Sequence, residues 1–261
     1  MRIFSCCALA LVLVSALFPA AVWAENTVIL GPELKPIDLH CLQVAYGENI
    51  AARGFFTDPT VLESLADSYP LEPQRPNVHV GQHPGRVRSY ALLRALYGKD
   101  KMAVQAHVQA VSAFGQRVYL SPAAAQAFRR VVQTLEALTL RKPYLRAYML
   151  PMGGFAWRSI AGENRLSPHS FGIAVDLNPA KGIYWRWSTP QKRQSIGAAA
   201  RAAYPSEIVA AFEAEGFIWG GKWYEYDLMH FEYRPEIICK AKRKASEQAL
   251  PSQSLKDPIC P

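Results

Sequence analysis

Two short stretches of this chain, SPHSFGIAVD at residues 167–176 and DLMH at residues 227–230, decide how it is interpreted. Together they supply two imidazoles and two carboxylates. Catalytic zinc generally takes three protein ligands drawn from His, Asp, Glu and Cys, and it keeps a fourth position for water. His169, Asp176 and His230 offer such a set. The two stretches therefore predict a zinc centre built from these three residues.

The spacing of the first two candidate ligands calls for a bend in the backbone. His169 and Asp176 are seven positions apart, so on one straight strand their side chains would point to opposite faces. A bend at Phe171 and Gly172 would bring them together, because glycine tolerates backbone conformations that other residues avoid. We expect the chain to turn there.

Two further charged residues are candidates for catalysis. Asp227 lies three positions before His230, where its carboxylate could take a proton from metal-bound water and pass it to a leaving amine. Glu225 is the nearby alternative. Arg158, eleven positions before His169, could hold a substrate carboxylate or stabilise an oxyanion.

Weaker candidates flank the same motifs. Ser167 could hydrogen-bond to substrate or to a ligand, and Glu232 could orient a ligand histidine from behind. A single histidine on an apolar strand is more often an ordinary core residue, and a single arginine is more often a surface ion-pair partner. Trp185, Trp187, Trp219 and Trp223 are likewise expected in the core. Only the joint pattern of histidines and carboxylates favours a metal site.

Hydrophobic periodicity predicts the fold class. Apolar residues recur at helical spacing after Ser121-Pro122 as far as Leu138, and a second helix is expected over 206–215 with Gly216 as its cap. Residues 172–177 and 229–233 have the composition of strands. This order favours an α+β fold: a small antiparallel sheet with helices packed on it and the zinc site on the sheet.

Residues 1–24 have the features of a secretory signal peptide. A basic start precedes an apolar run from Ala8 to Phe18, and small residues end the segment at Ala24. The run is shorter than the roughly 20 residues that span a bilayer. We expect cleavage after Ala24, no transmembrane segment afterwards, and a periplasmic or secreted protein.

The charge and cysteine content fit an exported protein. The net charge of +8 comes from scattered basic residues, apart from a cluster at 240–244, and nothing resembles a nucleic-acid-binding module. Cys41, Cys239 and Cys260 remain after signal cleavage. An oxidising compartment permits a disulfide. Cys239–Cys260 is the first choice and Cys41–Cys239 the rival.

The chain divides into four regions on these patterns. After the signal peptide comes an extension of unknown role at 25–100, punctuated by proline and glycine, with short helices expected at 62–66 and 89–97. The catalytic region is expected at 101–238. The polar tail at 239–261 is expected to be irregular. Oligomeric state is not predicted.

The pattern SxHxxGxAxD followed by an acidic residue three positions before a histidine resembles the D-alanyl-D-alanine carboxypeptidase family of zinc peptidases. That family includes vancomycin-resistance carboxypeptidases and L-alanyl-D-glutamate endopeptidases, and it shares its fold with the hedgehog signalling domain and lysostaphin-type peptidases. The resemblance implies zinc ligands at His169, Asp176 and His230, a catalytic base at Asp227 and a substrate contact at Arg158. Aspartate at the base position is more like the endopeptidase branch, since many carboxypeptidases carry glutamate there.

The resemblance extends over roughly residues 117–238 and includes the stretch GFIWGGKW at 216–223. It implies an exported zinc metallopeptidase that cuts peptidoglycan stem peptides, either as a D-Ala-D-Ala carboxypeptidase or as an L-Ala-D-Glu endopeptidase. The alternatives are a non-catalytic zinc protein that binds cell wall or stabilises the fold, and a peptidase for another substrate. A serine penicillin-binding enzyme is excluded, because the chain has neither a Ser-x-x-Lys nor a Lys-Thr-Gly motif.

Overall fold

The computed structural model describes residue 59, residues 61–72 and 77–249, and three two-residue strands near the N-terminus. These strands, β1 (Trp23–Ala24), β2 (Thr27–Val28) and β3 (Ile37–Asp38), pair antiparallel in that order. The rest of the predicted signal peptide lies outside the described residues, so that assignment stays a prediction. In the part of the chain that is described, no helix combines the length and apolar character needed to cross a membrane.

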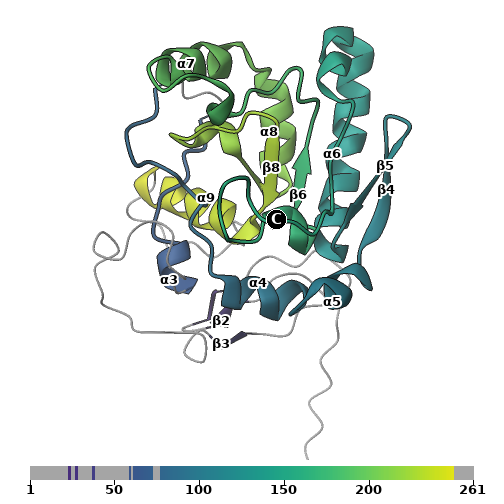
Figure 1. Ribbon diagram of the computed structural model, residues 1–261, viewed down its shortest axis with the longest axis vertical. Coiled ribbons are helices and arrows are strands. Elements are labelled where there is room, and N and C mark those ends of the chain that lie inside the picture. Colours follow the sequence, from purple (N-terminus) through teal and green to yellow (C-terminus); the bar gives the residue numbers. More distant parts are fainter. Residues whose placement is uncertain are drawn as a thin grey trace, which may run out of the picture.

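The centre of the fold is a three-stranded antiparallel sheet (Figure 1). Its strands are β6 (Ala174–Asp176), β8 (His230–Tyr233) and β7 (Phe217–Trp219), in the order β6-β8-β7. In the register of β6 and β8, Asp176 lies directly opposite His230. The predicted small antiparallel sheet is therefore confirmed, and its central pairing brings two of the predicted ligands together.

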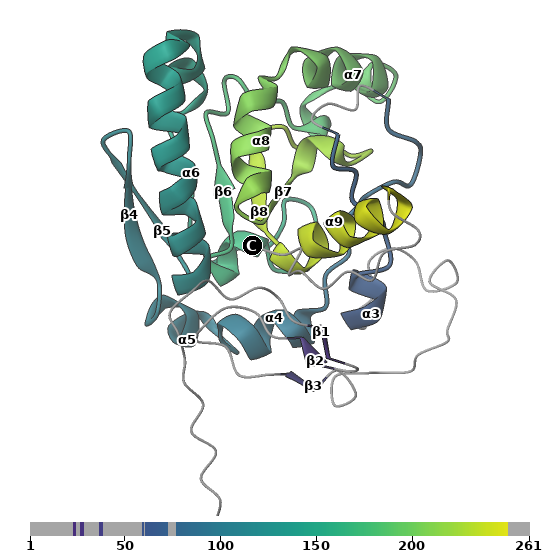
Figure 2. The same cartoon turned by 180° about the vertical axis from the view of Figure 1, so that it is seen from behind.

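Two helices, α6 (Pro122–Arg141) and α8 (Ser206–Ala214), lie behind the sheet (Figure 2). α6 begins at Pro122 as predicted, and its buried apolar stripe includes Phe128. Phe212 of α8 stacks on Phe231 of β8 at 3.9 Å between ring centroids, and all three rings are fully buried. Full burial of such a side chain contributes about 1.5–3 kcal/mol, so this aromatic layer anchors the sheet on the helices. The helices that pack on the sheet complete the predicted α+β class.

A hairpin of two strands and one helix beside these were not predicted. β4 (Gln109–Ala113) and β5 (Gln116–Leu120) form a hairpin that packs on α6. Its turn places Phe114 and Gly115 at φ values of 51° and 88°, a conformation that suits two-residue hairpin loops. Phenylalanine is an unusual residue at φ > 0, so the sequence gives little sign of the turn between β4 and β5. The helix α7 (Arg193–Ala203) follows the short 3-10 helix η3 (Trp185–Trp187).

The N-terminal segment packs directly on the catalytic part. α3 (Val61–Ser64) and α4 (Tyr90–Tyr97) correspond to the two predicted short helices, and α5 (Lys101–Gln105) follows. Ser89 caps α4 by accepting a hydrogen bond from the backbone N–H of Leu92 at 3.4 Å. Val61 shares one buried cluster with Ile218 of β7 and Ile237. The segment thus forms part of the same packed body.

The prediction of an irregular C-terminal tail is wrong for residues 239–249. Helix α9 (Pro235–Ala249) runs across the expected boundary at 238. Ile237, Ile238 and Ala241 are buried against the sheet and α3, and the ammonium of Lys240 donates to the carbonyl of Ala66 at 3.2 Å. Tertiary burial of one helix face overrides the polar composition. Cys239 of α9 is disulfide-bonded, and both predicted partners, Cys41 and Cys260, lie outside the described residues.

Candidate active site

Three neighbouring elements carry the predicted metal ligands. His169 lies on the short 3-10 helix η2 (Pro168–Phe171), Asp176 ends β6 and His230 begins β8. Gly172 closes η2 with φ 65°, in the left-handed region that glycine favours. The predicted bend is therefore confirmed. A helical turn before the bend, which was not predicted, places His169 beside Asp176.

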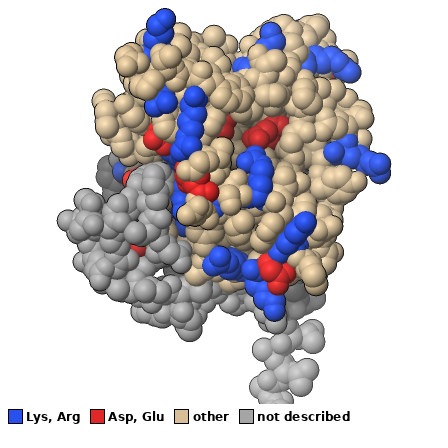
Figure 3. Space-filling model, in the orientation of Figure 1, with Lys and Arg blue, Asp and Glu red and all other residues tan. Residues whose placement is uncertain are grey.

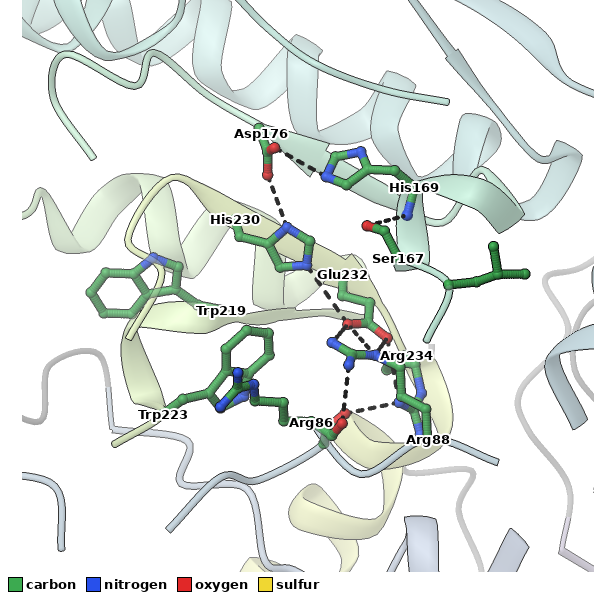
Figure 4. Close-up of polar contacts among 12 residues, drawn as sticks. Arg86, Arg88, Ser167, His169, Asp176, Trp219, Trp223, His230, Glu232 and Arg234 are labelled. Atoms are coloured by element: carbon green, nitrogen blue, oxygen red, sulfur yellow. Dashed lines mark hydrogen bonds and ion pairs between the residues drawn. The ribbon is translucent and has the colours of Figure 1, made fainter. Parts of the chain in front are cut away.

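The three side chains converge on one point (Figure 4). Asp176 Oδ2 lies 3.0 Å from His169 Nε2, and Asp176 Oδ1 lies 2.8 Å from His230 Nδ1. One ligand atom from each residue falls within 4.8 Å of the others. The sheet and the turn thus bring the predicted set together.

The ring of His169 is prepared for a metal. Its Nδ1 lies 2.7 Å from the carbonyl oxygen of Gly154, which can only accept, so Nδ1 carries a proton and Nε2 is the nitrogen left to face a metal. Nε2 is buried, lies 3.0 Å from Asp176 Oδ2 and makes no hydrogen bond with any described residue. A buried ring nitrogen next to a carboxylate and a second imidazole fits the donor chemistry of zinc. The residues present therefore fit the metal that the sequence predicts.

Asp176 and His230 stabilise each other in their charged forms. Burial by itself would lower the pKa of His230, but the hydrogen bond with Asp176 and the nearby carboxylate of Glu232 raise that pKa to about 9. Burial would likewise raise the pKa of Asp176, yet the two imidazoles pull it well below its usual range. Asp176 and His230 thus form an ion pair that shares a proton, and a metal bound by the two residues would have to displace that proton.

Asp227 lies in the same cleft as the three ligands. The turn before β8 holds its backbone: its N–H donates to Gly220 at 3.0 Å and its carbonyl accepts from the N–H of His230 at 3.3 Å. Its Oδ1 is buried with no hydrogen-bond partner among the described residues. Burial is the largest cause that raises the pKa of Asp227, to about 7, in the range suited to a general base at neutral pH.

The structure favours Asp227 over Glu225 as the candidate base. Glu225 also lines the cleft, but its carboxylate is engaged in an ion pair with Arg86. Arg158 lies at the cleft as predicted, with Nη2 at 3.9 Å from Asp176 Oδ2 and half of its side chain exposed to solvent. Ser167 accepts a hydrogen bond from the N–H of His169 at 3.4 Å, so it supports a ligand residue.

The cleft has a volume of about 250 Å³ and lies on the face where acidic and basic side chains gather near the middle (Figure 3). Trp219 is in the core as expected, and Trp223 is buried while lining the cleft. Trp187 is 61% exposed and forms part of the cleft wall with Tyr184, which corrects the expectation of a core residue. The cleft therefore combines charged and aromatic surfaces next to the ligands.

Sequence reasoning missed two arginines in this cleft. Arg86 and Arg88 lie in the segment before α4, where no chemical motif was recognised. Arg88 contacts Glu232, a residue 144 positions away, through both carboxylate oxygens. Nothing in the local sequence signals this pairing, because a short arginine-containing stretch is typical of a solvated surface.

One family model matches the chain over residues 161–233, and its description is D-alanyl-D-alanine carboxypeptidase. The matched segment contains His169, Asp176, Asp227 and His230, whereas Arg158 and the arginines before α4 precede it. No solved structure matches the chain. The match agrees with the resemblance carried by the two motifs: the segment that holds the three candidate ligands and Asp227 is similar to the D-alanyl-D-alanine carboxypeptidase family of peptidases.

Proposed function

We propose that the protein is an exported zinc metallopeptidase that hydrolyses peptidoglycan stem peptides at a bond next to a D-amino acid. The observation that carries this proposal is the convergence of His169, Asp176 and His230 at one cleft that also contains Asp227. The family match supports the peptidase class. Export rests on the signal-like residues 1–24.

Each proposed ligand offers a defined atom. His169 would bind through Nε2, because Nδ1 is committed to the carbonyl of Gly154. His230 would bind through Nδ1, the nitrogen that faces Asp176, while its Nε2 faces Glu232. Zinc held by these three residues would supply Lewis acidity, which makes water a nucleophile near neutral pH.

Asp227 supplies the proton transfers. Its buried carboxylate lies in the same cleft and has an oxygen with no hydrogen-bond partner among the described residues. It takes a proton as water attacks the peptide carbonyl, and the C–N bond then breaks as the same group donates that proton to the leaving amine. Burial raises the pKa of Asp227, which suits a carboxyl group that takes a proton and then returns it.

Arg158 recognises the substrate. Its half-exposed guanidinium stands at the cleft, within 3.9 Å of a carboxylate oxygen of Asp176. A planar guanidinium binds carboxylates through two parallel hydrogen bonds, and stem peptides carry carboxylates at their D-amino acids. Either removal of a terminal D-alanine or cleavage between L-alanine and D-glutamate is compatible with this arrangement.

The alternative of a purely structural zinc site fits less well. Structural zinc is usually enclosed by four protein ligands, whereas the cluster found among the described residues offers three and faces an open cleft. A structural site also has no need of a buried carboxylate such as Asp227. We therefore assign the site to catalysis.

Digestion of purified peptidoglycan fragments by the zinc-loaded protein, read by mass spectrometry, tests the proposal. Loss of one terminal alanine, abolished by a chelator and by Asp227→Asn, would establish the carboxypeptidase. Release of a peptide that begins with D-glutamate would establish the endopeptidase. No cleavage by a fully metallated protein would overturn the proposal in favour of wall binding or another substrate.

A further inference from the structure

The chain of polar contacts around His230 continues beyond the three candidate ligands. His230 and Glu232 are two positions apart on β8, so their side chains share one face of the sheet. Glu232 Oε2 lies 3.7 Å from His230 Nε2, on the side of the ring opposite the nitrogen that faces Asp176. The carboxylate of Glu232 is therefore placed to set the rotation of the ring.

Glu232 is in turn clamped by a residue from the N-terminal segment. Arg88 Nε lies 2.8 and 3.0 Å from the two oxygens of Glu232, and Arg88 Nη2 lies 2.6 Å from Oε2. The side chain of Arg88 is 3% exposed and that of Glu232 is fully buried. Bidentate pairing of this kind fixes geometry as well as charge. Figure 4 shows the resulting chain from Asp176 through His230 and Glu232 to Arg88.

Arg88 is itself held from behind. Its Nη1 donates to the backbone carbonyl of Arg86 at 3.0 Å, and its guanidinium lies 5.7 Å from the ring centroid of Trp223. The next residue, Ser89, caps helix α4. The backbone and the ring thus keep the guanidinium in one orientation.

Arg234 does not duplicate this clamp. Its Nη1 approaches Glu232 Oε1 at 3.4 Å, a single long contact. The same guanidinium donates to the carbonyl of Gly85 at 2.9 Å and forms an ion pair with Glu236. Loss of Arg88 would leave the carboxylate of Glu232 without its bidentate partner.

We propose that Arg88 is a positioning residue of the metal centre: by clamping Glu232 it fixes the imidazole of His230 with Nδ1 toward Asp176 and the metal position. The N-terminal segment around Arg88, which precedes the family-matched residues 161–233, is thereby a component of the site. The inference rests on the zinc site of the proposed function.

Zinc affinity of the full chain, measured by competition with a chromophoric chelator at one pH, tests this role. Removal of a hydrogen-bonding partner behind a metal ligand typically weakens metal binding by about 10- to 100-fold. We expect losses in this range for Arg88→Met and Glu232→Gln, with partial rescue in Arg88→Lys. Unchanged affinity in the folded Met and Gln variants would overturn the proposal.

Glu213→Gln is the matched control. Glu213 is also a buried carboxylate that joins the catalytic part to the N-terminal segment, through Tyr69, and it pairs with Lys222 at 2.6 Å. The variant should lose stability while its zinc affinity stays within about twofold of the wild type. An equal loss of affinity in this control would mean that general loosening explains the effect, and the positioning role would be wrong.

The visible absorption bands of the cobalt-substituted protein give a second readout, because they respond to ligand geometry. We expect them to change in Arg88→Lys and in Glu232→Gln but not in Glu213→Gln. If Arg88→Met does not fold, the double variant Arg88→Lys/Glu232→Gln decides. We compare the loss of zinc affinity that Arg88→Lys causes in the wild type with the loss that it causes in Glu232→Gln. An equal loss in both backgrounds would overturn the proposal, because Arg88 would then act without Glu232.

These measurements do not depend on peptide cleavage. A wild-type protein that binds no zinc would contradict the proposed function, whereas wild-type affinity retained in the Arg88 and Glu232 variants would contradict only the positioning role.

Discussion

Asp176 Oδ1 lies 2.8 Å from His230 Nδ1, and the two residues are direct partners across antiparallel strands β6 and β8. Side chains at paired positions of an antiparallel sheet project from the same face. A slip of one residue in the register would turn one of the two side chains to the opposite face. The metal site therefore depends on the same packing that aligns the central sheet.

Replacement of one ligand should empty the site. In His230→Ala, His169 and Asp176 are the only proposed ligands left, and two ligands hold zinc poorly. We expect metal content and peptidase activity to fall together, measured by elemental analysis of the purified variant. A His230→Ala protein with full metal content would contradict the ligand assignment.

The catalytic base should be separable from metal binding. Asp227→Asn keeps the size of the side chain and removes its proton-accepting carboxylate, so we expect unchanged zinc content and a fall in kcat of about 10²- to 10⁴-fold. Glu225→Gln is the control, because Glu225 is already paired with Arg86. Near-normal turnover of the Asp227 variant, with loss in the Glu225 variant, would move the base to Glu225.

Removal of the exposed guanidinium should act on substrate use. Arg158 has half of its side chain exposed, so Arg158→Ala should leave the fold and the zinc content intact. We expect a decrease in kcat/KM for stem peptides, with a smaller decrease for Arg158→Lys, which retains charge without the bidentate geometry. Unchanged kinetics in both variants would reduce Arg158 to a surface residue.

Zinc binding should depend on the absence of a side chain at Gly154. A Cβ added at Gly154 would lie 2.7 Å from the carbonyl of Tyr119 and 2.7 Å from Val118 Cγ1, and neither position can yield cheaply. Because the Gly154 carbonyl orients His169, Gly154→Ala should weaken zinc binding. Gly153→Ala is the control, since its Cβ would meet Asp176 at an ordinary 3.5 Å. Equal affinities in the two variants would show that this carbonyl does not position the ligand.

Stability should depend on the protonation of His83. Burial, with a smaller effect from Arg86, lowers the pKa of His83 to about 3, so between pH 6.5 and pH 3 the unfolded chain binds a proton that the folded protein excludes. The free energy of unfolding should therefore fall as pH drops through this window, by at most about 1.4 kcal/mol per pH unit from this group.

Urea unfolding of the wild type and of His83→Gln across this pH range isolates the effect. The wild type should lose stability relative to the variant as the pH falls, because glutamine does not titrate. A stability difference that stays constant from pH 7 to pH 4 would show that His83 does not contribute.

The sequence by itself determined the local features. The order of apolar residues placed α6 and α8, Ser89 marked the start of α4, and Gly172 marked the bend between His169 and Asp176. The set of candidate metal ligands was also predictable, because these residue types at this spacing have few other uses. Such features depend on the preferences of neighbouring residues and can be recognised from their order alone.

Only the tertiary structure decided what surrounds the ligands. The clamp of Arg88 on Glu232 joins residues 144 positions apart, and the Gly154 carbonyl reaches His169 across a loop. α9 became helical because one of its faces is buried under α3 and β7. Burial and long-range pairing stabilise these contacts, and neither is encoded in a local pattern, so the arginine that orients a metal ligand becomes visible only when the N-terminal segment is packed against the sheet.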